Sequence, residues 1–416
     1  MAYPKTLLGK VATRTNLLGA WEDVRRNTGP LSHGHSEQTV QDFGHNLRSN
    51  IELIRKQLLS NSYQFSLARG VIIPKKGGEP RMLVIQDIQD RVVQRAIARS
   101  LETHLIARFK LNNEASFAYL KGKGVQSAIK QMLRHHNDGC IYILEADIQD
   151  FFGAVDVPRL LNDILFPYLT DVTINGLITD ALTVEIGNRE NLPEEDWGNS
   201  TGLPQGGYLS PLFSNIYLAS FDQFMLSNHY RLIRYADDFI VMCETFEEAE
   251  KAFDACQVIL EDNLKLTLHP RSDAEISAKT RIVRVCQKPI EFLGVSFNGR
   301  RIWPAASKRD GLSKKIGAVC SGTNVKAILT SLHNLLEGWI AAYGFTDINP
   351  SYIDKIDNEL NASLNKGLRR LKWELKSKSL SHNQRLNSGV LTVKIYLARV
   401  RGAMKDKSLL SKYWTK

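Results

Sequence analysis

Hydrophobic residues recur at helical spacing in two long stretches of the N-terminal half of the chain. Residues 39–60 and 91–109 both place apolar side chains three or four positions apart, with polar side chains between them. This pattern predicts two amphipathic helices. The same spacing returns from about residue 311 onward, so we expect the C-terminal part of the chain to be helical as well.

A shorter pattern predicts strands. Residues 70–85 contain two apolar, β-branched runs around a Gly-Gly turn, which indicates a hairpin with a basic tip. Residues 141–148 and 231–243 are apolar runs of strand length, and each contains acidic residues. Strands with acids in the middle of the chain, followed by a helical segment, predict an α+β fold with an appended helical subdomain.

Length and composition are those of a globular protein. The chain has 416 residues, 43% of them hydrophobic, which is enough for two or three packed subdomains. No apolar run approaches the roughly 20 residues that span a bilayer, and the first residues lack the apolar core of a secretory signal. We therefore expect no membrane contact and a cytoplasmic location. The five cysteines form no CxxC pair, which argues against a zinc site or a disulfide framework.

The net charge of +10 is unevenly distributed. Residues 300–416 hold 22 Lys and Arg against 8 Asp and Glu, a charge of +14, which leaves −4 for the remainder. A basic segment joined to a slightly acidic body suits a polyanionic partner, because neutralised phosphates release their counterions. Solubility alone is an equally good explanation of this segment taken by itself.

Two adjacent acids, Asp237 and Asp238, interrupt an apolar stretch. Such acids repel each other and are costly to bury unless a cation neutralises them, although Asp-Asp is also a common turn dipeptide. A partner stands 90 residues earlier, where Asp147 ends another apolar run. Three hard oxygen ligands suit Mg²⁺, with Mn²⁺ as an alternative ion. Two such ions, about 4 Å apart, would activate a primer 3′-hydroxyl and stabilise a pyrophosphate leaving group.

A third element runs from Gly202 to Pro211 and leads into an apolar segment that suits a helix. Its small residues would let the backbone approach a base pair closely. Taken in isolation, the segment is more typical of a flexible loop before a core helix.

These elements, in this order, resemble the palm motifs of reverse transcriptases, and most closely those of the bacterial group II intron type. Five segments carry the resemblance: ADIQDFFGAVD, GLPQGGYLSPLFSNIYL, RYADDF, LKLTLHPRSDAEISAKTRI and FLGVSF. NLLGAWEDVRRNTG is similar to that family's N-terminal extension, IPKKGGEPRMLVIQDIQDRVVQRAI to its fingers, and LHNLLEGWIAAYG to its thumb. Nearly the whole chain is covered.

The resemblance implies a right-hand polymerase with fingers, a palm built on a ferredoxin-like antiparallel sheet, and a helical thumb. It divides the chain into an N-terminal extension at 1–64, fingers and palm at 65–300, and a basic thumb at 301–416. The implied activity is that of an RNA-directed DNA polymerase, a nucleotidyltransferase that takes an RNA template and deoxynucleoside triphosphates and makes complementary DNA.

The family's metal ligands correspond to Asp147, Asp237 and Asp238, with the backbone carbonyl of Ile148 completing a metal shell. Phe152 stands at the position of the aromatic residue that excludes a 2′-hydroxyl.

Other roles in substrate handling also carry over. Lys75 and Arg81 resemble the basic pair that clamps the incoming triphosphate, a task suited to an ammonium and a guanidinium. Gln205 and Gly206 would lie along the nascent base pair. Lys279 resembles a lysine that protonates pyrophosphate.

The chain also departs from the intron-encoded pattern. It ends after the thumb with no metal-ligand cluster of an endonuclease, and GPLSHGHSEQTV and EASFAYLKGKG replace family elements that contact the template. Retron and diversity-generating signatures are missing. A free-standing, defence-associated bacterial reverse transcriptase, working with a dedicated noncoding RNA against phage, is therefore the preferred expectation.

Two alternatives stay open. A group II intron maturase would grip intron RNA with its basic thumb and aid splicing and mobility. A noncatalytic RNA-binding protein with a relic palm would not need its acids. The priming mechanism, the product sequence and the oligomeric state do not follow from the sequence.

Overall fold

The computed structural model describes residues 6–73, 81–192, 202–275, 278–371, 390 and 392–403. Within these ranges the strands form sheets with the orders β1-β2, β4-β5-β3-β6 and β7-β8-β9, and helices make up most of the rest. The predicted α+β class is confirmed. Contacts divide the chain into two compact units, the first made of Met1–Lys121, Ala146–Phe239 and Ala252–Arg271, and the second of Gly122–Glu145, Ile240–Lys251 and Ser272–Lys416.

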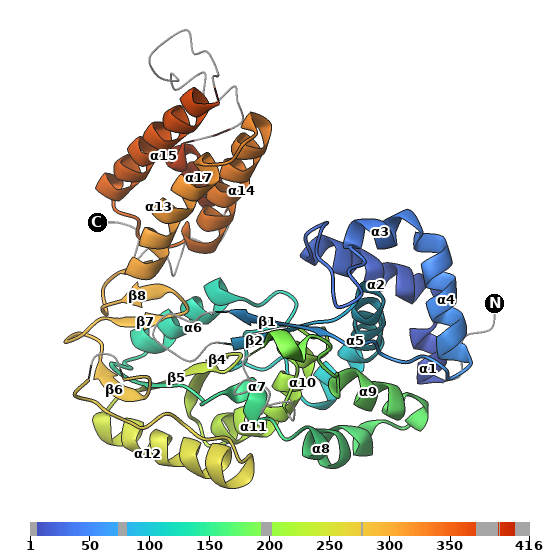
Figure 1. Ribbon diagram of the computed structural model, residues 1–416. Helices are drawn as coiled ribbons and strands as arrows, with labels where there is room; N and C mark the ends of the chain where they lie inside the picture. The colour runs from blue at the N-terminus through green and yellow to red at the C-terminus, as the bar shows by residue number, and fades with distance from the viewer. Residues whose placement is uncertain are drawn as a thin grey trace. The chain divides into compact units, whose positions relative to one another are not determined.

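The first unit begins with four helices packed around a long fifth one (Figure 1). Their bounds are α1 (Leu7–Val11), α2 (Arg14–Asn27), α3 (Val40–His45), α4 (Leu47–Leu59) and α5 (Ile88–Arg108). Thr39 and Asp42 form a capping box that starts α3. The helix predicted at 39–60 is present but breaks at Asn46 into α3 and α4, and the helix predicted at 91–109 begins three residues earlier.

The predicted hairpin is present. Strands β1 (Arg69–Ile73) and β2 (Arg81–Ile85) pair antiparallel, with Ile73 opposite Arg81. The tip of the hairpin, residues 74–80, lies outside the described residues.

The four-stranded sheet contains both acid-bearing segments. Its strands are β3 (Tyr142–Ala146), β4 (Arg231–Tyr235), β5 (Asp238–Cys243) and β6 (Arg281–Arg284). The strand predicted at 141–148 is therefore confirmed as β3, and residues 231–243 form a hairpin with a two-residue turn between β4 and β5. Strand β3 is antiparallel to β6.

Shorter helices connect these strands. They are α6 (Val125–Asn137), α7 (Phe151–Ala154), α8 (Val157–Arg159), α9 (Asn175–Leu182), α10 (Ser210–Tyr217), α11 (Ala219–Ser227) and α12 (Phe246–Gln257). Single π-helical segments occupy Leu160–Leu165 and Val258–Asn263, and 3₁₀ turns occupy Phe166–Tyr168, Val172–Ile174 and Arg189–Asn191.

The C-terminal part of the second unit is helical, as predicted, and forms a bundle (Figure 1). It consists of α13 (Ala306–Cys320), α14 (Val325–Tyr343), α15 (Pro350–Arg370) and α17 (Val393–Ala403), which follow the small sheet of β7 (Ile290–Phe292), β8 (Val295–Phe297) and β9 (Ile302–Pro304). The helices bury an apolar core that includes Ile316, Leu336 and Leu360. No described helix is both long enough and apolar enough to cross a bilayer.

A buried acid on α5 makes the stability of the protein depend on pH. The Asp90 carboxylate accepts hydrogen bonds from the Tyr63 hydroxyl (2.6 Å) and the Ser66 amide (3.1 Å), and burial raises its pKa to about 6. Because the folded protein holds this proton more tightly than the unfolded chain, the contribution of Asp90 is most favourable below pH 4. It is lost as the pH rises through 6.

We therefore expect Asp90 to lower the free energy of unfolding by about 2–3 kcal/mol between pH 4 and pH 7. Urea unfolding of the wild type and Asp90→Asn at both pH values checks this expectation. The difference between the two proteins should shift in favour of Asp90→Asn as the pH rises. An unchanged difference would contradict the prediction.

Candidate functional site

The three predicted metal-binding carboxylates occur where two neighbouring strands end or begin. Asp147 directly follows β3, Asp237 is the second residue of the turn between β4 and β5, and Asp238 is the first residue of β5. Strands β3 and β5 are adjacent in the sheet. Asp147 and Asp237 are half-buried and Asp238 is exposed, so these acids stay in reach of solvent and of a substrate.

The chemistry of these donors fits Mg²⁺. Among the described residues, no group of three or more His, Cys, Asp or Glu side chains is arranged to hold a metal ion. Mg²⁺ is commonly bound by one or two carboxylates and completes its shell with water and substrate phosphates. The half-buried acids can therefore serve as Mg²⁺ ligands without a preassembled three-residue cage.

The segment after β3 is fixed by a short pairing with residues 267–269. The His269 amide donates to the Asp147 carbonyl (3.0 Å), and the Gln149 amide donates to the Thr267 carbonyl (2.8 Å). These bonds flank an antiparallel bridge between Ile148 and Leu268, so the Ile148 carbonyl points away from the pairing, as a metal ligand would require. His269 Nε2 also lies 3.7 Å from Asp147 Oδ2. Sequence reasoning missed this histidine, although it stands within LKLTLHP.

Tyr119 is a second site residue that sequence reasoning missed. Ser116 forms a parallel bridge with Arg234 of β4, and Tyr119 and Asp237 each lie three residues after a member of this bridge. Burial, with a smaller effect of the Asp237 charge, raises the pKa of the Tyr119 hydroxyl. Tyr119 is 47% exposed, so solvent reaches this residue.

Gly202 starts the small-residue loop and lies against the segment that follows Asp147. The Leu203 amide donates to the Phe152 carbonyl (2.8 Å), and Gly202 itself is buried. A Cβ atom on Gly202 would meet the Phe152 carbonyl oxygen and would lie 2.6 Å from Gly153 Cα. Only glycine fits this contact without a backbone shift.

We expect Gly202→Ala to lower the free energy of unfolding by about 1–3 kcal/mol, because the backbone must move and strain the Leu203–Phe152 hydrogen bond. Urea unfolding measures this loss. Gly176→Ala is the matched control, since Gly176 is exposed in α9 with nothing within 4 Å of its added Cβ, and it should be neutral or slightly stabilising. Equal stability of both variants would contradict the prediction.

The same loop pairs with the hairpin. The Val84 amide of β2 donates to the Gln205 carbonyl (2.8 Å). Gly206 has a φ of +111°, and a Cβ there would lie 2.9 Å from the Val84 carbonyl oxygen. The Gln94 side-chain oxygen of α5 accepts a hydrogen bond from the Tyr208 amide (2.9 Å), which fixes the C-terminal part of the loop. The predicted residues Gln205 and Gly206 are thus brought to the strand that begins with Arg81, an exposed residue.

The remaining predicted residues are placed as follows. Phe152 is half-buried on α7, with its ring centroid 5.4 Å from that of Phe151. Asp156 caps α8 by accepting a hydrogen bond from the Arg159 amide (3.0 Å). Lys279 belongs to the second unit, two residues before β6. Lys75 lies outside the described residues.

A family model and two curated proteins match this chain. The sequence model of the reverse transcriptase (RNA-dependent DNA polymerase) family matches residues 73–297, which is more than half of the chain. Protein YkfC of Escherichia coli K12 is 28% identical over 265 residues, covering 54% of this chain and 66% of that protein. The group II intron-encoded protein LtrA of Lactococcus lactis subsp. cremoris is 25% identical over 360 residues, covering 71% of this chain and 57% of LtrA.

Two solved structures also align with the chain. A chain of a partial Cas6-RT-Cas1–Cas2 complex aligns with a TM-score of 0.37 and 26% identity, over 62% of this chain and 42% of its own length. Apo telomerase from Candida tropicalis aligns with a TM-score of 0.45 and 12% identity, over 84% and 68% of the two chains. The chain thus spans less than two thirds of the two curated relatives and of the first of these structures.

Proposed function

Because this chain belongs to the reverse transcriptase (RNA-dependent DNA polymerase) family, we propose that it is an RNA-directed DNA polymerase that copies an RNA template from deoxynucleoside triphosphates. The observation that carries the proposal is the placement of Asp147, Asp237 and Asp238 on neighbouring strands, with two of them at a tight turn. Acids at strand ends that solvent can reach are able to hold cations beside a substrate.

In this proposal the three carboxylates and the Ile148 carbonyl would hold two Mg²⁺ ions, or Mn²⁺ in their place. The bound ions would lower the pKa of the primer 3′-hydroxyl and neutralise charge on the leaving pyrophosphate. The chain keeps the donors in place by pairing residues 147–149 with residues 267–269 and by the turn that precedes β5.

The incoming nucleotide would be held by the loop and the hairpin. Arg81 and Lys75 would clamp the triphosphate, and Gln205 and Gly206 would lie along the nascent base pair. The pairing of Gln205 with Val84 supports this assignment, because it ties the loop to the strand that carries Arg81. Phe152 would exclude the 2′-hydroxyl of a ribonucleotide, and its carbonyl contact with Leu203 supports a position beside the same loop.

The basic C-terminal segment would grip the template. We propose an N-terminal extension at 1–64, fingers and palm at 65–300, and a thumb at 301–416, with Lys279 of the palm donating a proton to pyrophosphate. The helices of the bundle carry an excess of lysine and arginine, which suits phosphate contacts that are independent of sequence.

The biological role we propose is antiphage defence with a dedicated noncoding RNA as template and its complementary DNA as product. It rests on the departures from the intron-encoded pattern in the template-contacting elements. A group II intron maturase is the second candidate, and the similarity to LtrA over 71% of this chain favours it. A noncatalytic RNA-binding protein is the third candidate. The three acids disfavour it, because such a protein would not need them.

The test begins with protein purified from its native host and with sequencing of the RNA that accompanies it. Mg²⁺ and labelled deoxynucleotides are then added, beside an EDTA control and an Asp237→Ala/Asp238→Ala control. We expect labelled DNA complementary to one short noncoding RNA, and none in either control. An intron as the bound RNA would identify a maturase. No DNA from any supplied template and primer would overturn the polymerase proposal.

A further inference from the structure

We propose that Arg234 is a positioning residue for DNA synthesis, which holds the Asp237–Asp238 turn in place through the carbonyl of Ala236. This inference rests on the proposed polymerase function and concerns a residue that touches neither substrate nor metal. Arg234 is the fourth residue of β4 and is fully buried, as is unusual for an arginine.

The turn between β4 and β5 contains a residue in an unfavourable backbone conformation, which a hydrogen bond from Arg234 can stabilise. Ala236 has a φ of +60°, in the left-handed region that residues with a Cβ atom rarely adopt. Arg234 Nη1 donates a hydrogen bond to the Ala236 carbonyl (2.9 Å). Because the peptide bond is planar, fixing this carbonyl also fixes the amide of Asp237, and with it the direction in which the first acid leaves the turn.

The guanidinium is itself held rigidly. Nε and Nη2 donate to the two carboxylate oxygens of Asp222, both at 2.6 Å. Nη1 also donates to Asn215 Oδ1 (3.1 Å), and Nη2 to Ser116 Oγ (3.0 Å). With the Ala236 carbonyl, these contacts engage each of the five N–H donors that an arginine has. A fully engaged, planar group cannot rotate, so the turn is attached to a fixed point.

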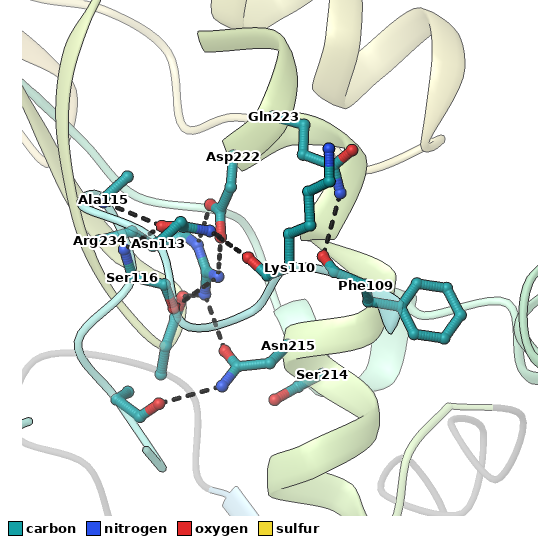
Figure 2. Close-up of polar contacts among 12 residues, drawn as sticks. Phe109, Lys110, Asn113, Ala115, Ser116, Ser214, Asn215, Asp222, Gln223 and Arg234 are labelled. Carbon is teal, nitrogen blue, oxygen red and sulfur yellow. Dashed lines mark hydrogen bonds and ion pairs between the residues drawn. The ribbon is translucent and has the colours of Figure 1, made fainter. Parts of the chain in front are cut away.

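The acceptors around Arg234 come from separate segments of the first unit (Figure 2). Asn215 belongs to α10 and Asp222 to α11, the two helices that follow the Gly202–Leu209 loop. Asn215 Nδ2 also donates to the Ala118 carbonyl (3.0 Å), one residue before Tyr119. Arg234 therefore links the turn that carries Asp237 to α10 and α11, the helices that follow the Gly202–Leu209 loop. This link keeps the turn and the two helices in a fixed position relative to each other.

A lysine cannot replace this arginine. Its ammonium has three donors and no planar fork, so it can pair with Asp222 but cannot also reach the Ala236 carbonyl in the same geometry. Arg234→Lys should therefore keep the charge and lose the positioning. We expect single-turnover DNA synthesis to slow by about tenfold to a hundredfold. The KM for deoxynucleotides should change much less, because the triphosphate contacts are elsewhere.

Two further variants separate positioning from a role in folding. In Arg234→Lys/Ala236→Gly, glycine takes the left-handed conformation without a steric penalty, so part of the lost rate should return. Asn215→Ala keeps the Arg234–Asp222 charge pair and replaces Arg234→Lys as the test if Arg234→Lys does not fold. Asn215→Ala should also slow DNA synthesis, and adding Ala236→Gly should restore part of that rate.

Arg95→Lys is the control. Arg95 pairs with Asp23 (2.8 Å) far along the sequence from the turn, so the rate of this variant should equal that of the wild type.

Binding of Mn²⁺ alone, followed by electron paramagnetic resonance, gives a readout that does not need activity. We expect Arg234→Lys to weaken it by about tenfold, as is typical when the support of a metal ligand is removed. An active wild type with unimpaired Arg234→Lys and Asn215→Ala, or a loss of rate that Ala236→Gly leaves unrelieved, would overturn the positioning role. An inactive wild type would instead overturn the polymerase proposal, and Mn²⁺ binding would still test Arg234.

Discussion

Replacing both acids of the turn, as in Asp237→Asn/Asp238→Asn, is expected to lower the rate of RNA-templated DNA synthesis by about a thousandfold or more. Asparagine keeps the size of each side chain and removes the negative charge, so the proposed divalent cation would lose its principal attraction. Primer extension with Mg²⁺ and with Mn²⁺ measures the loss. The fold should be retained, because relief of repulsion between adjacent carboxylates leaves the melting temperature unchanged or raises it.

The matched control removes two charges elsewhere. Asp254 of α12 and Asp262 in the π-helical segment after it are both exposed, and Asp254→Asn/Asp262→Asn should leave the rate unchanged. Retained synthesis in the turn variant would mean that the chemistry does not use these acids. Loss of synthesis in both double variants would assign the effect to total charge.

Asp222→Ala, which removes the counter-ion of Arg234, is expected to lower the free energy of unfolding more than Gly202→Ala or Glu145→Ala does. Asp222 and Arg234 are both 0% exposed, and Asp222→Ala would leave a buried guanidinium with neutral acceptors alone. Breaking a buried ion pair on one side typically costs about 3–5 kcal/mol, because the remaining charge has no compensation. Urea unfolding followed by circular dichroism measures this loss.

Glu145→Ala offers the comparison. Glu145 of β3 pairs with Arg281 of β6 at the same distance, 2.6 Å, but both side chains are 13% exposed. Burial raises the pKa of Glu145 in spite of its partner, so its charged form already carries a desolvation penalty. Its removal should cost clearly less than that of Asp222. Equal losses would show that burial of the remaining arginine does not decide the cost.

The sequence by itself determined the class of the fold and the identity of the candidate acids. Helical and alternating periodicities are local properties, so they located α5, the β1-β2 hairpin and the C-terminal helices with errors of a few residues. Asp147, Asp237 and Asp238 were recognisable because charge inside an apolar run is costly and therefore conspicuous. The break of the helix at Asn46 was not recognisable, because the apolar spacing continues across it.

The tertiary structure alone decided which of these residues meet. Nothing in the sequence says that Arg234 is buried against Asp222, that Gln205 pairs with Val84, or that Tyr119 and His269 stand beside the acids. Each of these contacts joins segments that only the packing of strands and helices brings together. The contribution of each contact to stability depends on burial, which no local pattern encodes. The candidate acids can be identified from the sequence, whereas the contacts that hold them in position form only in the folded chain.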